Sequence, residues 1–446
     1  MSRRSRRRQL PEPLEATIEA MSHEGRGIAR VNGKTVFVFG ALVGEKVRMQ
    51  ITKTNRNFDQ ANTLEVIEAS PQRIVPACEA YEVCGGCSLQ HMGSGDQVTF
   101  KQQSLLEMLV HAGISIAEIL PPLRASTWGY RKKARLGVKY VQKKGRVLVG
   151  FRERNAPFIA DMHRCEVLIP EVGHKLDLLS EMIGQLEARA QIPQIEVAAD
   201  ATHIQLVFRH LQPLSGHDLE ILTEFARQQN FYIQLQPGGP DTVHNLYPEQ
   251  QRLELDPMND LRPRIGFNAL DFVQVNTEIN QQMVAQALAL LDLQADDRVL
   301  DLFCGLGNFT LPMALACASV TGVEVDAAMV ARARQSALEN DIGNTDYQVV
   351  DLTQPDLTYP WMRQQYDKIL LDPPRSGAPE MAQLIGRFKA RRIVYVSCQP
   401  SSLVRDAAII CDQGYSMTHI GVMDMFPQTA HVESMAVFER KSRESK

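Results

Sequence analysis

The sequence predicts a multidomain α/β protein with a small N-terminal β-barrel, a central α+β domain and a C-terminal doubly wound parallel sheet. The 446 residues are enough for about three domains at roughly 150 residues each. Apolar and polar positions alternate between glycines early in the chain, and strand-like apolar runs alternate with helical stretches from Gly266 onwards. We therefore expect segments at 1–11, 12–70, 71–265 and 266–446.

The composition excludes several classes of protein. Hydrophobic residues make up 44% and charged residues 22% of the chain, which is close to the average for globular domains and argues against global disorder. No apolar run approaches the roughly 18 residues of a membrane-spanning helix. No apolar stretch follows the basic N-terminus, as one would in a secretory signal. We therefore expect a cytosolic monomer without membrane association.

Basic residues are unevenly distributed along the chain, although the net charge is only −4. Residues 1–8 contain five arginines and no acid, which predicts a disordered basic arm over 1–11. Residues 121–165 contain 12 lysines and arginines and two acids, with aromatic residues interleaved. Such a local excess favours a surface that binds nucleic acid over a merely solvated face.

The first 265 residues contain short strand and helix patterns. Over 14–68 the expected strands are Ala16–Ile18, Lys34–Phe39 and Glu45–Ile51, joined by glycine turns as in a small barrel. In the central part we expect a helix over 97–113, a hairpin across Lys143–Arg146, a helix over Leu176–Ala190, and strands over His203–Arg209 and Tyr232–Gln236.

The C-terminal part has five apolar runs separated by helical stretches such as Ala327–Asn340. This alternation predicts a parallel, doubly wound sheet, in which ligands bind at the carboxyl ends of the strands. The informative residues are therefore those that end or follow the runs, which are Val299–Phe303, Ser319–Val325, Tyr347–Asp351, Lys368–Asp372 and Arg392–Ser397.

The first run continues into a loop with two glycines, Gly305 and Gly307. A dinucleotide-binding loop would have a third glycine in place of Thr310, and would not set Asp301 beside a pyrophosphate. The loop instead suits a positively charged cofactor without phosphate, such as S-adenosylmethionine. At the next two strand ends, Glu324 could accept hydrogen bonds from ribose hydroxyls and Asp351 one from an adenine amino group.

Two later strand ends have reactive side chains. In Asp372-Pro373-Pro374-Arg375 the prolines stiffen the backbone and project the Asp372 carboxylate into the expected crevice. An arginine stands where amine methyltransferases have an aromatic residue, which counts against amine methylation. Cys398 ends the fifth strand beside this crevice. Cys304, Cys317 and Cys411 are interpreted as core residues, the last two within predicted helices.

A nucleophilic cysteine beside S-adenosylmethionine is needed when the methyl acceptor is a pyrimidine carbon. Uracil C5 is a weak nucleophile, but a thiolate that adds to C6 creates an enolate that can take the methyl group. A base must then remove the C5 proton so that the thiol can leave. We predict Cys398 as the nucleophile and Glu433 as the base, with His431 as its rival. Glu433 precedes the apolar run Met435–Phe438, which predicts a final strand.

Cys78, Cys84 and Cys87 form a C-x5-C-x2-C cluster, and Cys165 is the one other cysteine before the C-terminal domain. Disulfides are not expected in the cytosol. Four thiolates could hold tetrahedral zinc or an iron–sulfur cluster. The spacing does not decide between them.

Together and in this order, the motifs resemble those of the bacterial RNA uracil-C5 methyltransferases, in particular the iron–sulfur branch that acts on uracil 1939 of 23S rRNA. The likeness covers nearly the whole chain. It rests on Cys78-x5-Cys84-x2-Cys87 with Cys165, Phe272-Val273-Gln274-Val275-Asn276, Asp301–Phe309, Asp372–Arg375 and Ser397–Pro400. It implies a TRAM domain, an OB-like RNA-binding barrel, over 12–70, a Rossmann-like methyltransferase domain over 266–446, and 23S rRNA as the partner.

The resemblance also implies roles for single residues. It implies that the four cysteines hold a [4Fe-4S] cluster, that Cys398 is the nucleophile and that Glu433 is the base. The S-adenosylmethionine contacts that it implies are Gln274, Phe303, Asn308, Glu324, Asp351 and Asp372.

Other functions remain as alternatives. Related enzymes act on uracil 54 of tRNA, where the usual form lacks both the barrel and the cluster, or on uracil 747 of 23S rRNA, where the enzyme lacks the barrel. Residues 14–68 therefore favour position 1939. A non-catalytic iron–sulfur RNA-binding protein of ribosome assembly would explain the barrel and the basic segment but not Cys398 or Glu433. An RNA cytosine-C5 methyltransferase would share the thiolate chemistry, but would favour a Pro-Cys motif where this chain has Asp372–Arg375.

Overall fold

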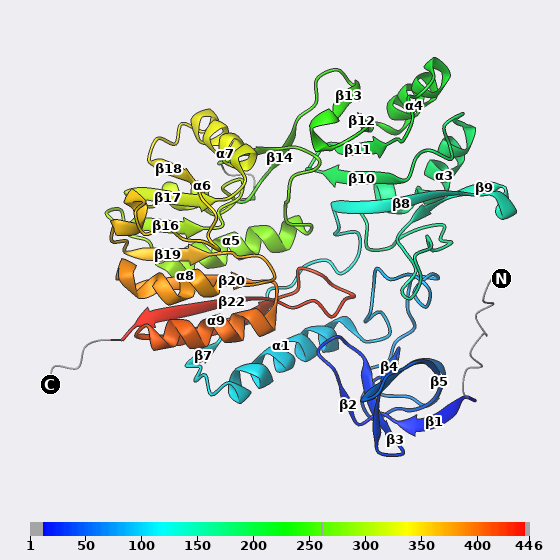
Figure 1. Cartoon of the computed structure of the whole chain (residues 1–446), viewed down its shortest axis with the longest axis horizontal. Coiled ribbons are helices and arrows are strands. Elements are labelled where there is room, and N and C mark those ends of the chain that lie inside the picture. Colours follow the sequence, from blue (N-terminus) through cyan, green and yellow to red (C-terminus); the bar gives the residue numbers. More distant parts are fainter. Residues whose placement is uncertain (1–11, 260–261, 442–446) are drawn as a thin grey trace, which may run out of the picture.

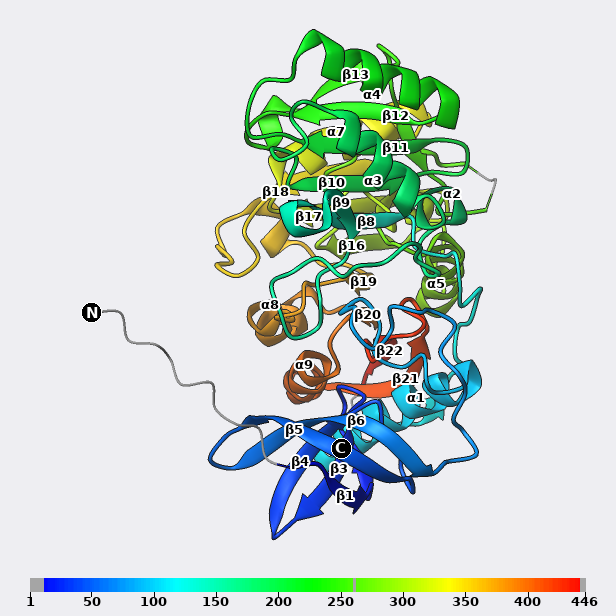
Figure 2. The same cartoon turned by 90° about the vertical axis from the view of Figure 1, so that its right-hand side faces the viewer.

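The computed structural model describes residues 12–259 and 262–441, so the predicted basic arm over 1–11 lies outside the described residues. Three β-sheet units follow one another along the chain (Figure 1). The N-terminal barrel and the central sheet lie at opposite ends of the molecule when it is viewed from the side (Figure 2). No helix in the two described ranges is both long and apolar enough to cross a membrane.

The N-terminal unit is the predicted small barrel. Its strands are β1 (Leu14–Thr17), β2 (Ala20–Met21), β3 (Gly27–Val31), β4 (Lys34–Phe39), β5 (Lys46–Thr54) and β6 (Phe58–Glu68), in the sheet order β1-β5-β6-β4-β3-β2. The sheet closes on itself because the Ile18 amide donates to the Glu45 carbonyl (2.9 Å) and the Glu19 amide donates to the Ile28 carbonyl (2.8 Å). Alternate apolar side chains, such as Val36 and Val38, fill its interior.

The central unit is a six-stranded sheet with helices packed against it. Its strands are β8 (Lys133–Val141), β9 (Arg146–Gly150), β10 (Gln194–Ala199), β11 (Ile204–Arg209), β12 (Tyr232–Gln236) and β13 (His244–Tyr247), and its helices are α2 (Pro170–Gly173), α3 (Leu176–Gln185) and α4 (Gly216–Gln229). The predicted hairpin forms between β8 and β9, where Gly145 takes a φ of +63°. The two-stranded pair β14 (Leu253–Leu255) and β15 (Ile265–Phe267) leads into the next unit.

The C-terminal unit is an eight-stranded sheet. Its strands are β7 (Glu118–Ile119), β16 (Arg298–Leu302), β17 (Ser319–Glu324), β18 (Thr345–Val349), β19 (Lys368–Leu371), β20 (Arg392–Ser397), β21 (Tyr415–Met423) and β22 (Glu433–Arg440). Their order is β18-β17-β16-β19-β20-β22-β21-β7, and the first five of these are parallel to one another. This confirms the predicted parallel sheet, to which β22 adds an antiparallel strand.

Helices cover both faces of this sheet, as expected for a doubly wound fold. One face packs against α5 (Thr277–Leu291), α6 (Thr310–Ala314) and α7 (Ala327–Glu339). The other packs against α8 (Pro379–Leu384), α9 (Pro400–Asp412) and α1 (Ser94–His111). The helix predicted over Leu176–Ala190 ends earlier, at Gln185, and Cys317 follows α6 rather than lying within a helix.

Helix α1 and strand β7 belong to the C-terminal core, although the sequence predicts residues 71–265 as one central domain. Val98, Leu105 and Leu109 of α1 pack in the same core as the C-terminal sheet, and β7 pairs with β21. Figure 1 shows α1 beside α9. An amphipathic helix must bury its apolar stripe, but the stripe itself does not say against which sheet.

Candidate active site

The loop after β16 has the backbone that a close ligand contact requires. Phe303, Gly305 and Gly307 all have positive φ, at +66°, +54° and +90°. A Cβ at Gly307 would lie 3.2 Å from the Tyr347 hydroxyl and 3.3 Å from Leu311 Cγ, so this turn has little room for a larger residue.

Asp301 lies fully buried beneath this loop. One carboxylate oxygen accepts a hydrogen bond from the Thr310 hydroxyl at 2.5 Å, and the other has no protein partner. Burial raises the pKa of Asp301 to about 8, and the charges of Asp372 and Glu324 add to this rise. An unpaired buried carboxyl oxygen calls for a cationic donor, so the residues of this loop fit the cationic cofactor predicted above.

Glu324 closes β17 and lies against the glycine loop. One of its oxygens accepts from the Gly305 amide at 3.2 Å, and the other accepts from the amides of Val325 (2.8 Å) and Asp326 (3.0 Å). These contacts hold the carboxylate at the carboxyl end of the strand, as predicted.

Asp351 does not close the third strand, because β18 ends at Val349 and the predicted strand bounds are wrong by two residues. Its side chain is exposed and accepts from the Thr353 amide (2.9 Å) and hydroxyl (2.7 Å), which lowers its pKa. In this structure the carboxylate therefore caps its own turn.

Asn308 has a partner that the sequence did not indicate. Its side-chain amide exchanges two hydrogen bonds with Asn280 of α5, at 2.9 and 3.0 Å. Asn280 lies one helical turn after Asn276, the N-cap of α5, which is the only signal in the sequence that could have found it. Gln274 lies just before this cap and is half-buried.

Cys398 and Glu433 lie near each other at the edge of the sheet. The antiparallel pairing of β20 with β22 ends where Ser397 is opposite Ser434; Cys398 directly follows β20 and Glu433 is the first residue of β22. Asp372 follows β19 at the same edge, and its amide donates to the Leu302 carbonyl at 3.2 Å. Cys398, Glu433 and Asp372 therefore lie at one edge of the sheet, close enough for their charges to interact.

These groups form a cluster of acids with two basic residues nearby, Arg375 and Lys101. Burial and the charges of Glu433 and Asp372 raise the pKa of Cys398 to about 12, whereas Arg375 lowers it. Burial raises the pKa of Asp372 to about 7. Burial and the Asp372 charge raise the pKa of Glu433 well above its ordinary value, against Arg375 and Lys101. The site is therefore suited to a ligand with positive charge.

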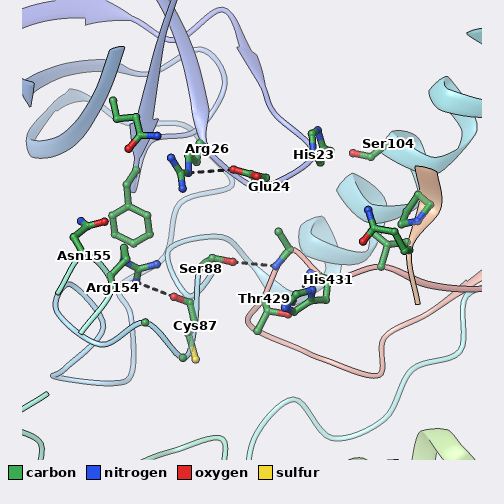
Figure 3. A pocket seen from close by; sticks show the side chains of 18 of the residues that line it. His23, Glu24, Arg26, Cys87, Ser88, Ser104, Arg154, Asn155, Thr429 and His431 are labelled. Atoms are coloured by element: carbon green, nitrogen blue, oxygen red, sulfur yellow. Dashed lines mark hydrogen bonds and ion pairs between the residues drawn. The ribbon is translucent and has the colours of Figure 1, made fainter. Parts of the chain in front are cut away.

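A cleft of about 500 Å³ leads from Cys398 to the barrel. One wall is the loop before β22, with Thr429 and His431, and the opposite wall includes His23 and Arg26 of the barrel (Figure 3). Burial and the charges of Arg375, Lys101 and Arg131 lower the pKa of His431. Of the two candidate bases, His431 lines this cleft, whereas Glu433 is buried in strand β22.

The four cysteines of the predicted cluster line one small cavity. Burial raises the pKa of each thiol, to about 12 for Cys87 and about 11 for Cys165. The charges of other cysteines of the cluster add to this rise for Cys84, Cys87 and Cys165. The Gly86 amide points at Cys84 Sγ, at 3.4 Å. Over residues 12–259 and 262–441, no group of three or more His, Cys, Asp or Glu side chains has the geometry of a metal-ion site. The chemistry of this donor set nevertheless fits a cationic group, because four thiolates together require positive charge.

Some basic residues of the segment 121–165 form ion pairs with acids of the same chain. Arg135 pairs with Glu196, and Lys144 and Arg146 both pair with Asp161. Arg154 and its neighbour Asn155 line the cleft. Arg154 and Asn155, which belong to the predicted nucleic-acid surface, thus line the same cleft as Cys398.

The chain matches two known families and several known proteins. A family described as tRNA (Uracil-5-)-methyltransferase matches residues 206–441, and one described as TRAM domain matches residues 7–62. The chain is 50% identical over 442 residues to a protein of Alcanivorax borkumensis named 23S rRNA (uracil(1939)-C(5))-methyltransferase RlmD, a match that covers 98% of this chain and 99% of the relative. It is 48% identical over 444 residues to the protein of the same name from Xanthomonas campestris, with 98% and 100% covered.

A solved structure has the same overall fold. It is the crystal structure of Pyrococcus abyssi tRNA (uracil-54, C5)-methyltransferase in complex with S-adenosyl-L-homocysteine. The TM-score is 0.73 at 20% identity, and the match covers 95% of this chain and 100% of that chain.

Proposed function

The chain belongs to the RNA uracil-C5 methyltransferases, the enzymes that methylate uracil with S-adenosylmethionine, and from that premise we propose that it methylates C5 of uracil 1939 in 23S rRNA. The proposed route is a covalent adduct of Cys398 and proton removal by Glu433. The observation that carries the proposal is that Cys398 directly follows β20 where this strand pairs with the start of β22 at Glu433, close enough for the Glu433 charge to act on the thiol. Near-full-length relatives with that name and almost half of their residues in common support the choice of substrate.

The cofactor residues we propose gather around the glycine loop. Bound S-adenosylmethionine supplies an electrophilic methyl group beside a positive charge. The residues that would hold it are Gln274, Phe303, Asn308, Glu324, Asp351 and Asp372. Asp301 lies buried next to these residues, and its unpaired carboxyl oxygen could interact with a cationic group. Asp351 would have to leave its contacts with Thr353 to take part.

The protein's own groups would act in sequence on the target base. The Cys398 thiolate forms a bond to C6, and the C5–C6 electron pair moves into an enolate over C5, C4 and O4. C5 would then take the methyl group, while the bond between that methyl group and the cofactor sulfur breaks and leaves its electron pair on sulfur, so that S-adenosylhomocysteine is the leaving group. Glu433 takes the proton from C5, the C–H electron pair restores the C5–C6 double bond, and the bond from sulfur to C6 breaks to release Cys398.

The thiol must lose its proton before this sequence can begin. In the free site its pKa is about 12, because Cys398 is buried beside acids. A positive charge at Asp372 and the N-terminus of α9, which begins at Pro400, both favour the thiolate. We therefore expect the thiol to become reactive only when the cofactor site is filled.

We further propose that Cys78, Cys84, Cys87 and Cys165 hold a [4Fe-4S] cluster. Their common cavity, and the rise in pKa that burial and neighbouring thiols cause in Cys87 and Cys165, support a cationic group there. A cluster held by four cysteines has no open iron position, so its expected role is structural or in RNA contact. Zinc is the competing ligand, and a fully zinc-loaded protein after anaerobic purification would overturn this assignment.

The cleft between the barrel and the loop before β22 would hold the RNA strand next to the target base. It is lined by Cys398 on one side and by barrel residues such as Arg26 and Asn62 on the other. Because single-stranded or looped RNA is recognised by stacking and by polar contacts to splayed bases, a mixed polar and aromatic cleft of this kind suits it. The barrel thereby becomes part of the substrate site.

The test is mass spectrometry of nucleosides from unmodified 23S rRNA that has been incubated with the protein and methyl-labelled S-adenosylmethionine. We expect label in 5-methyluridine, at position 1939 after fragment mapping. Cys398→Ala should abolish labelling and leave RNA binding intact. Label in cytidine, at uracil 747 or in tRNA would contradict the assigned substrate, and turnover by Cys398→Ala would contradict the covalent route.

A further inference from the structure

The loop that precedes Glu433 is held in an unfavourable backbone shape. This loop, residues 424–432, joins β21 to β22, and Glu433 is the first residue of β22. Gln428 within it has a φ of +70°, a left-handed conformation that a glutamine adopts only where the surrounding structure holds it. The contacts that hold Gln428 therefore determine how the chain enters β22.

Gln97 of α1 provides the first of these contacts. Its side-chain Oε1 accepts a hydrogen bond from the Gln428 amide at 2.9 Å, and its Nε2 lies 3.0 Å from Gln428 Oε1. The same Nε2 lies within hydrogen-bond distance of the Leu89 and Met92 carbonyls, at 3.0 and 2.9 Å. Gln97 and Gln428 are 1% and 2% exposed, so water cannot replace these bonds.

Lys101 holds the loop one helical turn further along α1. Its ammonium group donates to Asp424 at 2.6 Å and to the Phe426 carbonyl at 3.0 Å. Lys101 and Asp424 are 1% and 4% exposed. Because Gln97 and Lys101 are four residues apart, they project from the same face of α1 and hold both ends of the segment 424–428.

The segment after Cys87 holds the loop from the other side. The amides of Ser88 and Leu89 donate to the Gln428 carbonyl at 2.9 and 3.0 Å, and the Ala430 amide donates to the Ser88 hydroxyl at 3.0 Å (Figure 3). The backbone N–H and C=O groups of Gln428 are thus both bonded to parts of the chain more than 300 residues away in sequence.

We propose that Gln97 and Lys101 are positioning residues for Glu433, and that they act on the removal of the C5 proton. The proposal rests on the function proposed above, in which Glu433 is the base. Neither residue lines the cleft that contains Cys398, and neither belongs to the cofactor loop. Their effect reaches the reaction through the loop that ends at Glu433.

The charges that face Glu433 agree with this assignment. Asp372, at the end of β19, opposes ionisation of Glu433, whereas Arg375 in the following loop and Lys101 on α1 favour it. Of these three charged residues, Lys101 also forms hydrogen bonds with the loop over residues 424–432. Removing it should therefore disturb both the place and the charge of the carboxyl group.

Variants without the contacts of Gln97 or Lys101 should slow the removal of the C5 proton more than the earlier formation of the Cys398 adduct. Thiolate addition and methyl transfer depend on Cys398 and the cofactor loop, whereas release of the RNA depends on the base. A displaced base should leave the methylated RNA covalently attached to Cys398. Displacement by about 1 Å can cost on the order of 100-fold in rate, so we expect release to slow by about 10- to 100-fold.

The experiment uses the full-length protein with an unmodified 23S rRNA fragment and methyl-labelled S-adenosylmethionine. Labelled protein–RNA complex that survives denaturing gel electrophoresis is measured beside labelled free RNA over a single turnover. The variants are Gln97→Ala and Gln428→Gly, with Glu433→Gln as reference. Glycine adopts a positive φ without strain, so Gln428→Gly keeps the backbone shape and removes the side-chain contact with Gln97 Nε2, while the backbone amide of residue 428 can still donate to Gln97 Oε1. Gln103→Ala, an exposed glutamine of the same helix, is the matched control.

We expect Gln97→Ala to accumulate the labelled complex as Glu433→Gln does, and Gln428→Gly, which keeps one of the two bonds to Gln97, to accumulate less of it. RNA affinity should stay unchanged in both, and Gln103→Ala should release its product at the normal rate. Normal release by Gln97→Ala and Gln428→Gly, or an equal fall in complex formation and release, would overturn the positioning role. If Glu433→Gln itself releases product normally, the base assignment is wrong and the positioning role falls with it.

A second measurement separates Lys101 from a purely structural effect. Lys101→Met removes a charge that favours the ionised base, so the pH at which release becomes half-maximal should move upwards. The thermal unfolding temperature of the same variant is measured beside it. A lower unfolding temperature with an unshifted pH profile would contradict the role of Lys101 in positioning Glu433.

Discussion

At the scale of single residues, the site contains more buried acids than basic residues. Asp301, Asp372 and Glu433 all have pKa values above the ordinary range, mainly because they are buried. Burying carboxylates in this way destabilises the empty site. The cost is offset only when a positive ligand is present, which links cofactor binding to the ionisation of these groups.

The first prediction follows from that link. The pKa values of Asp301 and Asp372 are about 8 and about 7, against an ordinary 3.8, so at pH 7 the free site has Asp301 mostly protonated and Asp372 about half protonated. A cation lowers both pKa values, and S-adenosylmethionine binding should therefore release protons. Its affinity should rise as the pH increases towards about 8 and level off above that value.

Calorimetry in two buffers with different ionisation enthalpies measures this release at pH 7. Asp372→Asn should reduce the number of protons released, whereas Asp356→Asn, an exposed carboxylate with a lowered pKa, should not change it. Binding without proton release in the wild-type protein would contradict the charge argument.

At the scale of elements, Arg154 connects the loop that contains Cys84 and Cys87 to the barrel. Its guanidinium lies 3.6 Å from the centre of the Phe39 ring on β4. One of its nitrogens donates to the carbonyls of Tyr81 (3.0 Å), Cys84 (2.9 Å) and Cys87 (2.8 Å). A planar guanidinium can stack on a ring and donate in its own plane at the same time, which an ammonium cannot.

The second prediction is that Arg154→Lys weakens the contact between these two elements although the charge is kept. Loss of the stacking and of the buried carbonyl contacts should lower the free energy of unfolding by about 1–3 kcal/mol and raise the KM for rRNA. Denaturant unfolding and steady-state kinetics measure the two effects. Arg152→Lys is the matched control, since Arg152 donates only to the exposed Pro157 carbonyl among the contacts described, and it should change neither quantity.

At the scale of the whole molecule, the loop before Glu433 is where the three units meet. The loop belongs to the C-terminal sheet, the segment after Cys87 bonds to it, and the barrel touches both. A Cβ at Gly25 of the barrel would lie 2.7 Å from the Leu89 side chain and 3.1 Å from Ala430 Cβ. The segment that follows the proposed cluster ligand Cys87 and the loop that leads to Glu433 are thus in contact, although they are more than 300 residues apart in the sequence.

The third prediction concerns the cysteines. Cys84 and Cys165 lie in the core of the central sheet, so loss of the cluster that we propose for them should affect more than the cavity. Cys84→Ser should remove the iron absorbance, lower the unfolding temperature, and expose Ser88 and Leu89 to faster amide hydrogen exchange. Cys411→Ser, in α9 of the C-terminal unit, should keep the iron. Unchanged exchange at Ser88 and Leu89 after cluster loss would show that the cluster does not stabilise this loop.

Much of the fold and of the site follows from the sequence alone. Strands Lys34–Phe39, Tyr232–Gln236 and Arg392–Ser397 have the predicted bounds, because the period of apolar residues within a strand is a local property. Cys398 and Asp372 could be identified because in a parallel sheet the residues after each strand meet at one edge. The order of the motifs identified the family for the same reason, since each motif is a short, local piece of chemistry.

Only the tertiary structure decided which distant groups meet. The packing of α1 on the C-terminal sheet, the pairing of Asn280 with Asn308, and the contacts of Gln97 and Arg154 leave no mark in the residues around them. An apolar stripe or a polar side chain requires a partner, but its own sequence does not specify which one. That choice depends on how three separate sheets pack together, which is why the residues that support Glu433 were visible only in the folded chain.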